Sequence, residues 1–386
     1  MDFALSEEHE ALRKTVEEFA RDAVAPSAVE LDATGDFPYD IVRQMGEMGL
    51  FGLPFPETYG GMGGDYFALC LAIEELARAD SSVAITLEAG VGLGAMPIYR
   101  FGTEEQKQQW LPRLCAGKAL GAFGLTEPFG GSDAGATRTR AGLVDEEWVI
   151  NGNKAFITNA GTRISELVTV TAVTGERPGG KKEISAILVP TPRAGFTAAP
   201  KYSKVGWHAS DTRELAFENC RVPAGNLLGE RGRGYANFLS TLDEGRIAIS
   251  ALAVGLAQAC VDESVAYAKE RHSMGRPIGS HQAVAFRIAD MEQRTHVARL
   301  GYYDAAARML AGKPFKKQAA IAKLYSSEIA VTNARDATQI FGGYGFMNDY
   351  PVARHWRDSK ILEIGEGTSE VQRMLIAREL GLPPST

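Results

Sequence analysis

The chain has 386 residues, 45% of them hydrophobic, and its 41 basic and 48 acidic side chains give a net charge of −7. This composition is typical of a globular protein of two or three domains, and without a basic stripe nucleic acid is not an expected partner. The acidic start MDFALSEEHE does not resemble a signal peptide, and no run of about 18 apolar residues is evident, so we expect a cytoplasmic protein that makes no membrane contact.

The hydrophobic pattern divides the chain into three segments. Up to residue 120 apolar residues recur with the helical period, for example in FALCLAIEELARA. From 121 to 230, short β-rich runs such as ISAILVP alternate with Gly, Pro and Asn. From 231 to 386 long helical patterns return, over roughly 234–272, 280–311 and 315–341, followed by a shorter pair. The pattern predicts a mainly α protein with an N-terminal helical domain (1–120), a middle β domain (121–230) and a C-terminal helical bundle (231–386).

Two short motifs imitate known sites, and their context argues against both. GVGLGA (90–95) matches the Gly-x-Gly-x-x-Ala dinucleotide fingerprint, but no acidic residue follows about 20 positions on and the surroundings are helical. GGSDA (130–134) approaches the nucleophile elbow of serine hydrolases, but it opens a β segment instead of joining a strand to a helix. The four cysteines are far apart and the six histidines lack paired spacing, so we expect no disulfide framework and no metal site.

Five further motifs occur in a fixed order along the chain: FGLTEPFGGSDAG (123–135), NGNKAFITNAG (151–161), LDEGRIAISALAVGLAQ (242–258), QIFGGYGFMNDYPVARHWRD (339–358) and IGEGTSEVQRMLIAR (364–378). Together they resemble the acyl-CoA dehydrogenase family over essentially the whole chain. The resemblance implies an N-terminal helical domain, a middle β-barrel and a C-terminal four-helix bundle, usually in a homotetramer. It also implies FAD bound without a Rossmann domain, an acyl-CoA substrate, and an electron-transfer flavoprotein as electron acceptor.

The stretch EIGEGTSE (363–370) raises the question of which carboxylate does chemistry. Ser369 and Gln372 have the spacing of a capping box, which predicts a helix start and places Glu366 in the loop before it. The pattern alone favours a solvated loop carboxylate. The resemblance to the family's Glu-Gly-Thr motif instead implies that Glu366 is the base that removes the α proton.

A rival base lies on the first long helix of the predicted bundle. One branch of the family carries its glutamate there, at the position that corresponds to Gly245 in this chain. Glu244 is one residue away, which on a helix is about 100° around the axis. We therefore favour Glu366 and keep Glu244 as the alternative.

The resemblance assigns the remaining roles position by position. Arg271, Gln282 and the stretch from Gln339 to Gly343 are implied to reach the FAD of a neighbouring subunit. Phe156 stands where tryptophan is common, so the aromatic face is kept and the indole donor is lost. The implied cofactor contacts are Phe123, Leu125, Thr126, Ser132, Phe156, Ile157, Thr158, Arg271, Gln282, Gln339, Phe341, Gly342, Gly343, Thr368, Ser369 and Glu370. The implied substrate contacts are Ser132, Asp243, Arg246, Gly365 and Gly367.

The substrate is predicted from the residues beside the base. Gly365 stands where many straight-chain members of the family carry Tyr, and branched-chain isovaleryl-type members also carry Gly there. Segment 89–96, AGVGLGAM, resembles the segment that lines the family's acyl pocket and is made of small residues. We expect a short, branched acyl-CoA such as isovaleryl-, isobutyryl- or 2-methylbutyryl-CoA, with butyryl-CoA as the nearest competitor. Two alternatives stay open: Gly365 only eases the turn, or the fold serves a flavin oxidase or a non-oxidising lyase of a CoA thioester.

Overall fold

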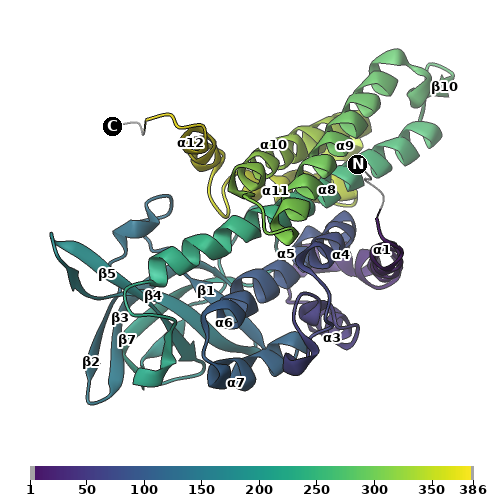
Figure 1. The fold of residues 1–386 in the computed structure, drawn as a ribbon. Helices are drawn as coiled ribbons and strands as arrows, with labels where there is room; N and C mark the ends of the chain where they lie inside the picture. Colours follow the sequence, from purple (N-terminus) through teal and green to yellow (C-terminus); the bar gives the residue numbers. More distant parts are fainter. Residues whose placement is uncertain (1–4, 384–386) are drawn as a thin grey trace.

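A computed structural model describes residues 5–383 and begins with a layer of helices packed along the side of a long helical bundle (Figure 1). Polar caps fix several helix starts: Asp65 accepts a hydrogen bond from Ala68 N, and Asp80 accepts from Ser82 N and Val83 N. The elements of this layer are α1 (Glu7–Phe19), α2 (Ala28–Thr34), α3 (Tyr39–Glu47), α4 (Tyr66–Ala79), α5 (Ser81–Glu88), the π-helix η5 (Ala89–Ala95), α6 (Met96–Phe101) and α7 (Glu104–Cys115).

The middle segment forms one eight-stranded sheet with the order β6-β7-β3-β2-β4-β5-β8, and β1 pairs in parallel with β4. Its strands are β1 (Leu120–Gly124), β2 (Arg140–Val144), β3 (Glu147–Thr158), β4 (Ser165–Arg177), β5 (Lys181–Pro190), β6 (Phe196–Ala198), β7 (Thr212–Pro223) and β8 (Leu227–Leu228). The register of β3 against β7 shifts between Lys154 and Ile157. Phe156 lies within this irregularity with a φ of +60°, and its side chain is exposed.

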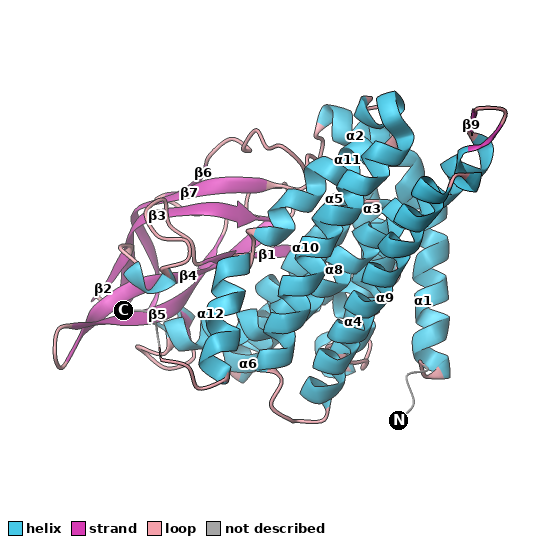
Figure 2. Cartoon of the chain, turned by 90° about the horizontal axis from the view of Figure 1, so that it is seen from above, coloured by secondary structure: helices cyan, strands magenta, loops and turns pink. Residues whose placement is uncertain are grey.

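The C-terminal segment is built on three long helices that run side by side (Figure 2). They are α8 (Gly234–Glu270), α9 (Gln282–Leu310) and α10 (Lys316–Phe341), followed by α11 (Pro351–Ser359) and α12 (Ser369–Glu379). A small hairpin of β9 (His272–Ser273) and β10 (Arg276–Pro277) caps the bundle end that lies away from the sheet (Figure 1). The predicted helix–β–helix order is confirmed.

Two helical stretches, Ser81–Phe101 and Gly234–Glu270, are long and apolar enough to meet the length and composition of a membrane span. The expectation that no such stretch exists was therefore wrong. Their most apolar windows are 94% and 83% buried inside the fold, because α4, α5 and α10 pack around α8. A helix that is apolar all round belongs in the core of a large protein as well as in a membrane.

Candidate active site

Glu366 stands in the loop between η10 (Lys360–Glu363) and α12, as the sequence predicts. Its backbone has a φ of +51° and that of the next residue, Gly367, a φ of +92°, so two consecutive residues adopt left-handed conformations. A non-glycine residue held there carries backbone strain of about 1–3 kcal/mol. The loop thereby directs the Glu366 side chain into the protein, where both carboxylate oxygens are shielded from solvent.

The Glu366 carboxylate meets a second buried acid, Glu88 at the end of α5. Glu88 is fully buried, and neither carboxyl group forms a hydrogen bond of regular geometry with any described residue. The unpartnered hydroxyl of Tyr66 from α4 lies in the same cluster: a Cβ placed on Gly92 would be 2.9 Å from Glu88 Oε1 and 3.5 Å from Tyr66 Oη. Buried polar atoms without partners are costly, so a cluster of them is a candidate for ligand contact.

Burial determines which of the two acids ionises first. Burial raises the pKa of Glu366 to about 7, while the neighbouring protonated carboxyl group of Glu88 and the positive charges of Lys323 and Arg246 lower it. Burial raises the pKa of Glu88 well above its usual range, and the nearby Glu366 raises it further. Glu88 therefore holds the proton near neutral pH and Glu366 is the acid that titrates, which suits a general base.

The rival position on α8 is adjacent to the same carboxylate. A Cβ placed on Gly245 would lie 2.3 Å from Glu366 Oε2, so a side chain there and the Glu366 carboxylate compete for one space. Glu244 is buried and forms an ion pair with Arg100 of α6. Burial raises the pKa of Glu244 to about 7, while Arg100 opposes the rise. Glu244 is thus held by a cation, whereas the Glu366 carboxylate lies in the space that Gly245 leaves free.

The start of α12 differs from the predicted capping box. Thr368, not Ser369, is the N-cap, and its hydroxyl accepts from Val371 N at 3.2 Å. The side chain of Gln372 turns instead to the strained loop, where Nε2 donates to the carbonyls of Gly367 (2.9 Å) and Glu366 (3.3 Å). Because Thr368 and Ser369 both carry a hydroxyl group that can cap a helix, the sequence does not distinguish which of the two is the N-cap.

Predicted cofactor contacts from the β domain come together around β1 and β3. The carbonyl of Thr126 accepts from Ala155 N at 2.9 Å, which places Leu125 and Thr126 beside the end of β3. Phe156 is 67% exposed there and offers an open aromatic face. The side chain of Phe123 stacks on Phe238 and that of Ile157 lies in the sheet core, so neither side chain is available to a ligand. Thr158 is partly exposed. Ser132 lies exposed in the loop that follows β1.

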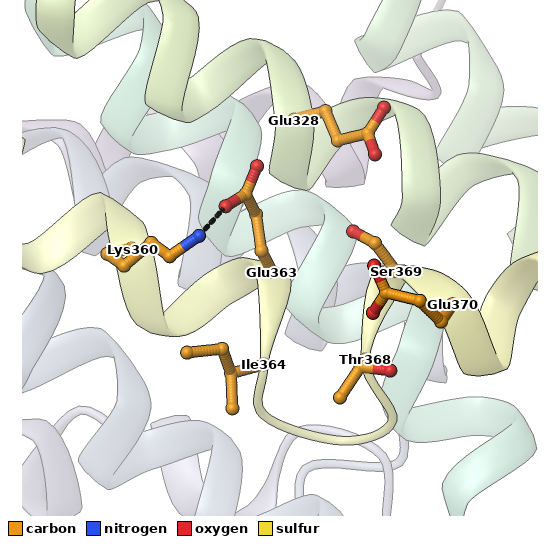
Figure 3. A pocket seen from close by; sticks show the side chains of 7 residues that line it. All are labelled: Glu328, Lys360, Glu363, Ile364, Thr368, Ser369 and Glu370. Atoms are coloured by element: carbon orange, nitrogen blue, oxygen red, sulfur yellow. Dashed lines mark hydrogen bonds and ion pairs between the residues drawn. The ribbon is translucent and has the colours of Figure 1, made fainter.

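A second group of predicted contacts lines a small pocket beside α12 (Figure 3). The pocket has a volume of about 160 Å³, and its lining includes Thr368, Ser369 and Glu370. The Ser369 hydroxyl is buried and has no hydrogen-bond partner among the residues that the structure describes. An unpartnered donor in a hollow fits a polar ligand group, so these residues suit the contact that the family resemblance implies.

The third group lies at the opposite end of the bundle, beside the β9–β10 hairpin (Figure 1). A groove of about 560 Å³ there is lined by residues that include Arg271, Phe341, Gly342 and Gly343. Gln282 and Gln339 are exposed outside its lining. One chain does not bring this group together with Phe156, and its contact with the FAD of a neighbouring subunit stays a prediction.

The two charged residues predicted to contact the substrate, Asp243 and Arg246, are one turn apart on α8 and form a buried ion pair. Lys316 Nζ lies 2.8 Å from the other oxygen of Asp243, and the Nε of Arg246 has no partner among the described residues. Arg246 therefore keeps a free donor for an anionic or carbonyl group. Of the glycines, Gly367 is part of the strained loop; Gly365 precedes Glu366 and has no left-handed φ.

Three residues of this cluster were missed by the sequence analysis: Glu88, Lys323 and Tyr66. Each falls on a helix whose periodic pattern shows only that it packs, and none belongs to a short motif. A lysine at a buried position of an otherwise apolar helix face is the one signal that could have pointed to Lys323. Among residues 5–383, no group of His, Cys, Asp or Glu is arranged to hold a metal ion.

Comparison with known proteins agrees with this arrangement. Three family models match: the acyl-CoA dehydrogenase N-terminal domain over residues 6–118, the middle domain over 122–220 and the C-terminal domain over 232–381. A probable acyl-CoA dehydrogenase of Bacillus subtilis is 51% identical over 98% of this chain and 100% of its own.

Two solved structures share the fold. Butyryl-CoA dehydrogenase from Megasphaera elsdenii matches with a TM-score of 0.95 and 42% identity, over 98% of this chain and 100% of that one. A chain from the structural work on the electron transferring flavoprotein of Acidaminococcus fermentans matches with a TM-score of 0.95 and 43% identity, over 98% of this chain and 99% of that one. With its three domain matches, its relative of 51% identity and its buried acid in the loop before the last helix, this chain belongs to the acyl-CoA dehydrogenase family of oxidoreductases.

Proposed function

We propose that this protein is an FAD-dependent dehydrogenase that converts a short, branched acyl-CoA to the trans-2-enoyl-CoA, with Glu366 as the base. The observation that carries the proposal is a shielded Glu366 carboxylate whose pKa, raised to about 7 by burial, suits proton abstraction at neutral pH. An acyl-CoA is a weak carbon acid, so the carboxylate must be held against the α carbon in a site that excludes water.

The residues around the base supply position, charge and exclusion of water. Glu366 takes the α proton, and the strained loop fixes the direction from which it does so. Arg246, with its free Nε, is suited to the anionic tail of CoA. FAD, which Phe156, Thr126 and Ser369 would contact, supplies the acceptor for the β hydrogen that leaves as hydride.

The branched substrate is the finer part of the proposal and rests on Gly365. Its φ lies outside the left-handed region, and a Cβ placed on it would meet only Ile361, at 3.4 Å and 4.0 Å. The backbone therefore does not require glycine here, and the alternative that Gly365 only eases the turn loses its physical reason. The likeness to short-chain and butyryl-CoA dehydrogenases supports a short acyl chain.

Electron transfer and assembly complete the proposal. The similarity to a chain studied with an electron transferring flavoprotein supports such a protein as acceptor. The exposed groove lined by Arg271 and Gly343 supports a homotetramer in which one subunit contributes to the FAD site of another. We further propose a cytoplasmic location, which the four buried free cysteines suit because a reducing compartment keeps thiols free.

The function is tested by adding acyl-CoA to the purified yellow protein without oxygen. Butyryl- and isovaleryl-CoA should bleach the flavin band, and Glu366→Gln should keep FAD and substrate binding while losing reduction by at least ~10²–10⁴-fold. A colourless folded protein, or reduction that survives in Glu366→Gln, would contradict the assignment. Rapid reoxidation by oxygen would favour the oxidase alternative, and turnover without bleaching would favour the lyase.

The substrate class is tested separately by comparing kcat/KM for isovaleryl-, isobutyryl-, 2-methylbutyryl-, butyryl- and octanoyl-CoA. We expect preference for the branched chains by ~10- to 200-fold, since one methyl group is worth ~1–3 kcal/mol in an apolar pocket. Gly365→Tyr should reverse that ratio. Preference for octanoyl-CoA, or an unchanged ratio in the variant, would refute the branched substrate and leave the dehydrogenase assignment intact.

A further inference from the structure

The buried lysine Lys323 on α10 stands directly beneath the loop that carries the base. Its side chain is fully buried, and Nζ donates a 2.7 Å hydrogen bond to the carbonyl of Gly367. No carboxylate of the described residues lies within ion-pair distance of Nζ. Burying an ammonium group without a direct counter-ion costs folding free energy, so a lysine at this position is expected to serve the site in a way that offsets this cost.

The loop carbonyl that Lys323 binds belongs to the strained part of the loop. Glu366 and Gly367 both have positive φ, and the Gly367 carbonyl accepts from Lys323 Nζ and from Gln372 Nε2. The Glu366 carboxylate itself has no hydrogen bond of regular geometry to a described residue. The direction in which the Glu366 carboxylate points is therefore set by its backbone. The side chains of Lys323 and Gln372 hold that backbone through their hydrogen bonds to the Gly367 carbonyl.

Lys323 also contributes charge to the pocket. Burial lowers the pKa of Lys323 to about 8, and the negative charge of Glu366 is the main influence that opposes this fall. Reciprocally, Lys323 lowers the pKa of Glu366. The ionised base and the ammonium group thus stabilise each other across a site that excludes water.

We propose that Lys323 is the positioning residue of the base: its ammonium group fixes the Gly367 carbonyl, and with it the strained backbone that aims Glu366, while its charge favours the ionised carboxylate. This inference rests on the proposed function and assigns Lys323 a role that the sequence analysis did not foresee.

Other groups face the same two side chains and act on the same equilibrium. Glu88 from α5 opposes the ionisation of Glu366 by its own charge when it loses its proton, whereas its protonated form lowers the pKa of Glu366. Arg246 from α8 lowers the pKa of Glu366 and also that of Lys323. The remaining groups are Tyr66 from α4, whose pKa burial raises well above its usual value, and Glu363 and Glu370, whose charges raise the pKa of Lys323.

The test compares Lys323→Met, which removes charge and donor, with Lys323→Gln, which removes the charge and keeps an amide donor. Both are measured as FAD-loaded full chains for FAD content, thermal stability, butyryl-CoA affinity and the rate of anaerobic flavin reduction from pH 5.5 to 9. We expect substrate affinity within a few fold of the parent and a reduction rate ~10²-fold lower in Lys323→Met, the cost of displacing a catalytic group by about 1 Å. In both variants the pKa of Glu366 rises, so the acidic limb of the pH profile should move up by about one pH unit.

Lys204→Met is a matched control, since Lys204 Nζ donates to the carbonyl of Ser210 at 2.6 Å and burial lowers its pKa to about 8. Lys204 lies in the loop before β7, and we expect its variant to keep the parent pH profile. An acidic limb that stays in place in both Lys323 variants, or one that moves equally in Lys204→Met, would overturn the proposal. Because the parent is first shown to be reduced and Glu366→Gln to be inactive, failure of the proposed function is distinguishable from failure of this inference.

Discussion

Gly245 on α8 provides the most direct test of how the base is accommodated. In Gly245→Ala the new Cβ would lie 2.3 Å from Glu366 Oε2, whereas carbon and oxygen normally approach no closer than about 3.3 Å. The carboxylate must therefore move by roughly 1 Å, and a displacement of that size costs about 10²-fold in rate. Alanine is also favoured over glycine within a helix by ~0.5–1 kcal/mol, which offsets part of the steric cost to the free energy of unfolding.

The assay is single-turnover flavin reduction by butyryl-CoA in a stopped-flow instrument without oxygen, together with urea unfolding. Gly301→Ala is the matched control, because a Cβ on Gly301 of α9 would be 3.8 Å from its nearest neighbour, Ala322. We expect the control to reduce flavin at the parent rate and Gly245→Ala to be about 10²-fold slower with bound FAD. If Gly245→Ala reduces flavin within a few fold of the control, the Glu366 carboxylate does not work from the position in this structure.

Three further predictions concern neighbouring parts of the protein. Glu244→Gln should reduce flavin at a rate within about 10-fold of the parent, because Glu244 is paired with Arg100, whose side chain is 37% exposed and can be solvated when the pair is broken. A loss as large as the ~10²–10⁴-fold expected for Glu366→Gln would instead identify Glu244 on α8 as the base. Phe156→Ala should bind FAD about 2- to 10-fold more weakly in a fluorescence titration, since one aromatic contact contributes ~0.5–1.5 kcal/mol; unchanged affinity would show that Phe156 does not cover the flavin. Burial lowers the pKa of His355 to about 3 from 6.5, so below pH 6.5 the unfolded chain binds a proton that the folded chain does not, and stability is lost as the pH falls from 6.5 towards 3. Between pH 7 and 5 urea unfolding should show that the parent loses ~2 kcal/mol more than His355→Gln, and equal losses would refute this source of acid sensitivity.

Much of the architecture was open to prediction from the sequence because it depends on local patterns. Apolar residues at the helical period marked α8, α9 and α10 to within a few residues of their bounds, since such a stripe has only one low-energy way to be buried. The loop position of Glu366 also followed from local signals, namely flanking glycines and hydroxyl residues ahead of α12. The misplaced cap at Ser369 marks the limit of this reasoning, since adjacent Thr and Ser side chains carry the same signal.

The sequence by itself thus determined the helix–β–helix order and, through the family's motifs, the carboxylate to consider first. Only the tertiary structure decided that Glu88 and Lys323 surround Glu366, because α5, α10 and the loop before α12 meet only when the helices pack. It also decided that Gly245 leaves the space in which the carboxylate lies. The proton affinity of the base follows from these contacts, because desolvation depends on everything that excludes water around a group and no short stretch of sequence contains that information.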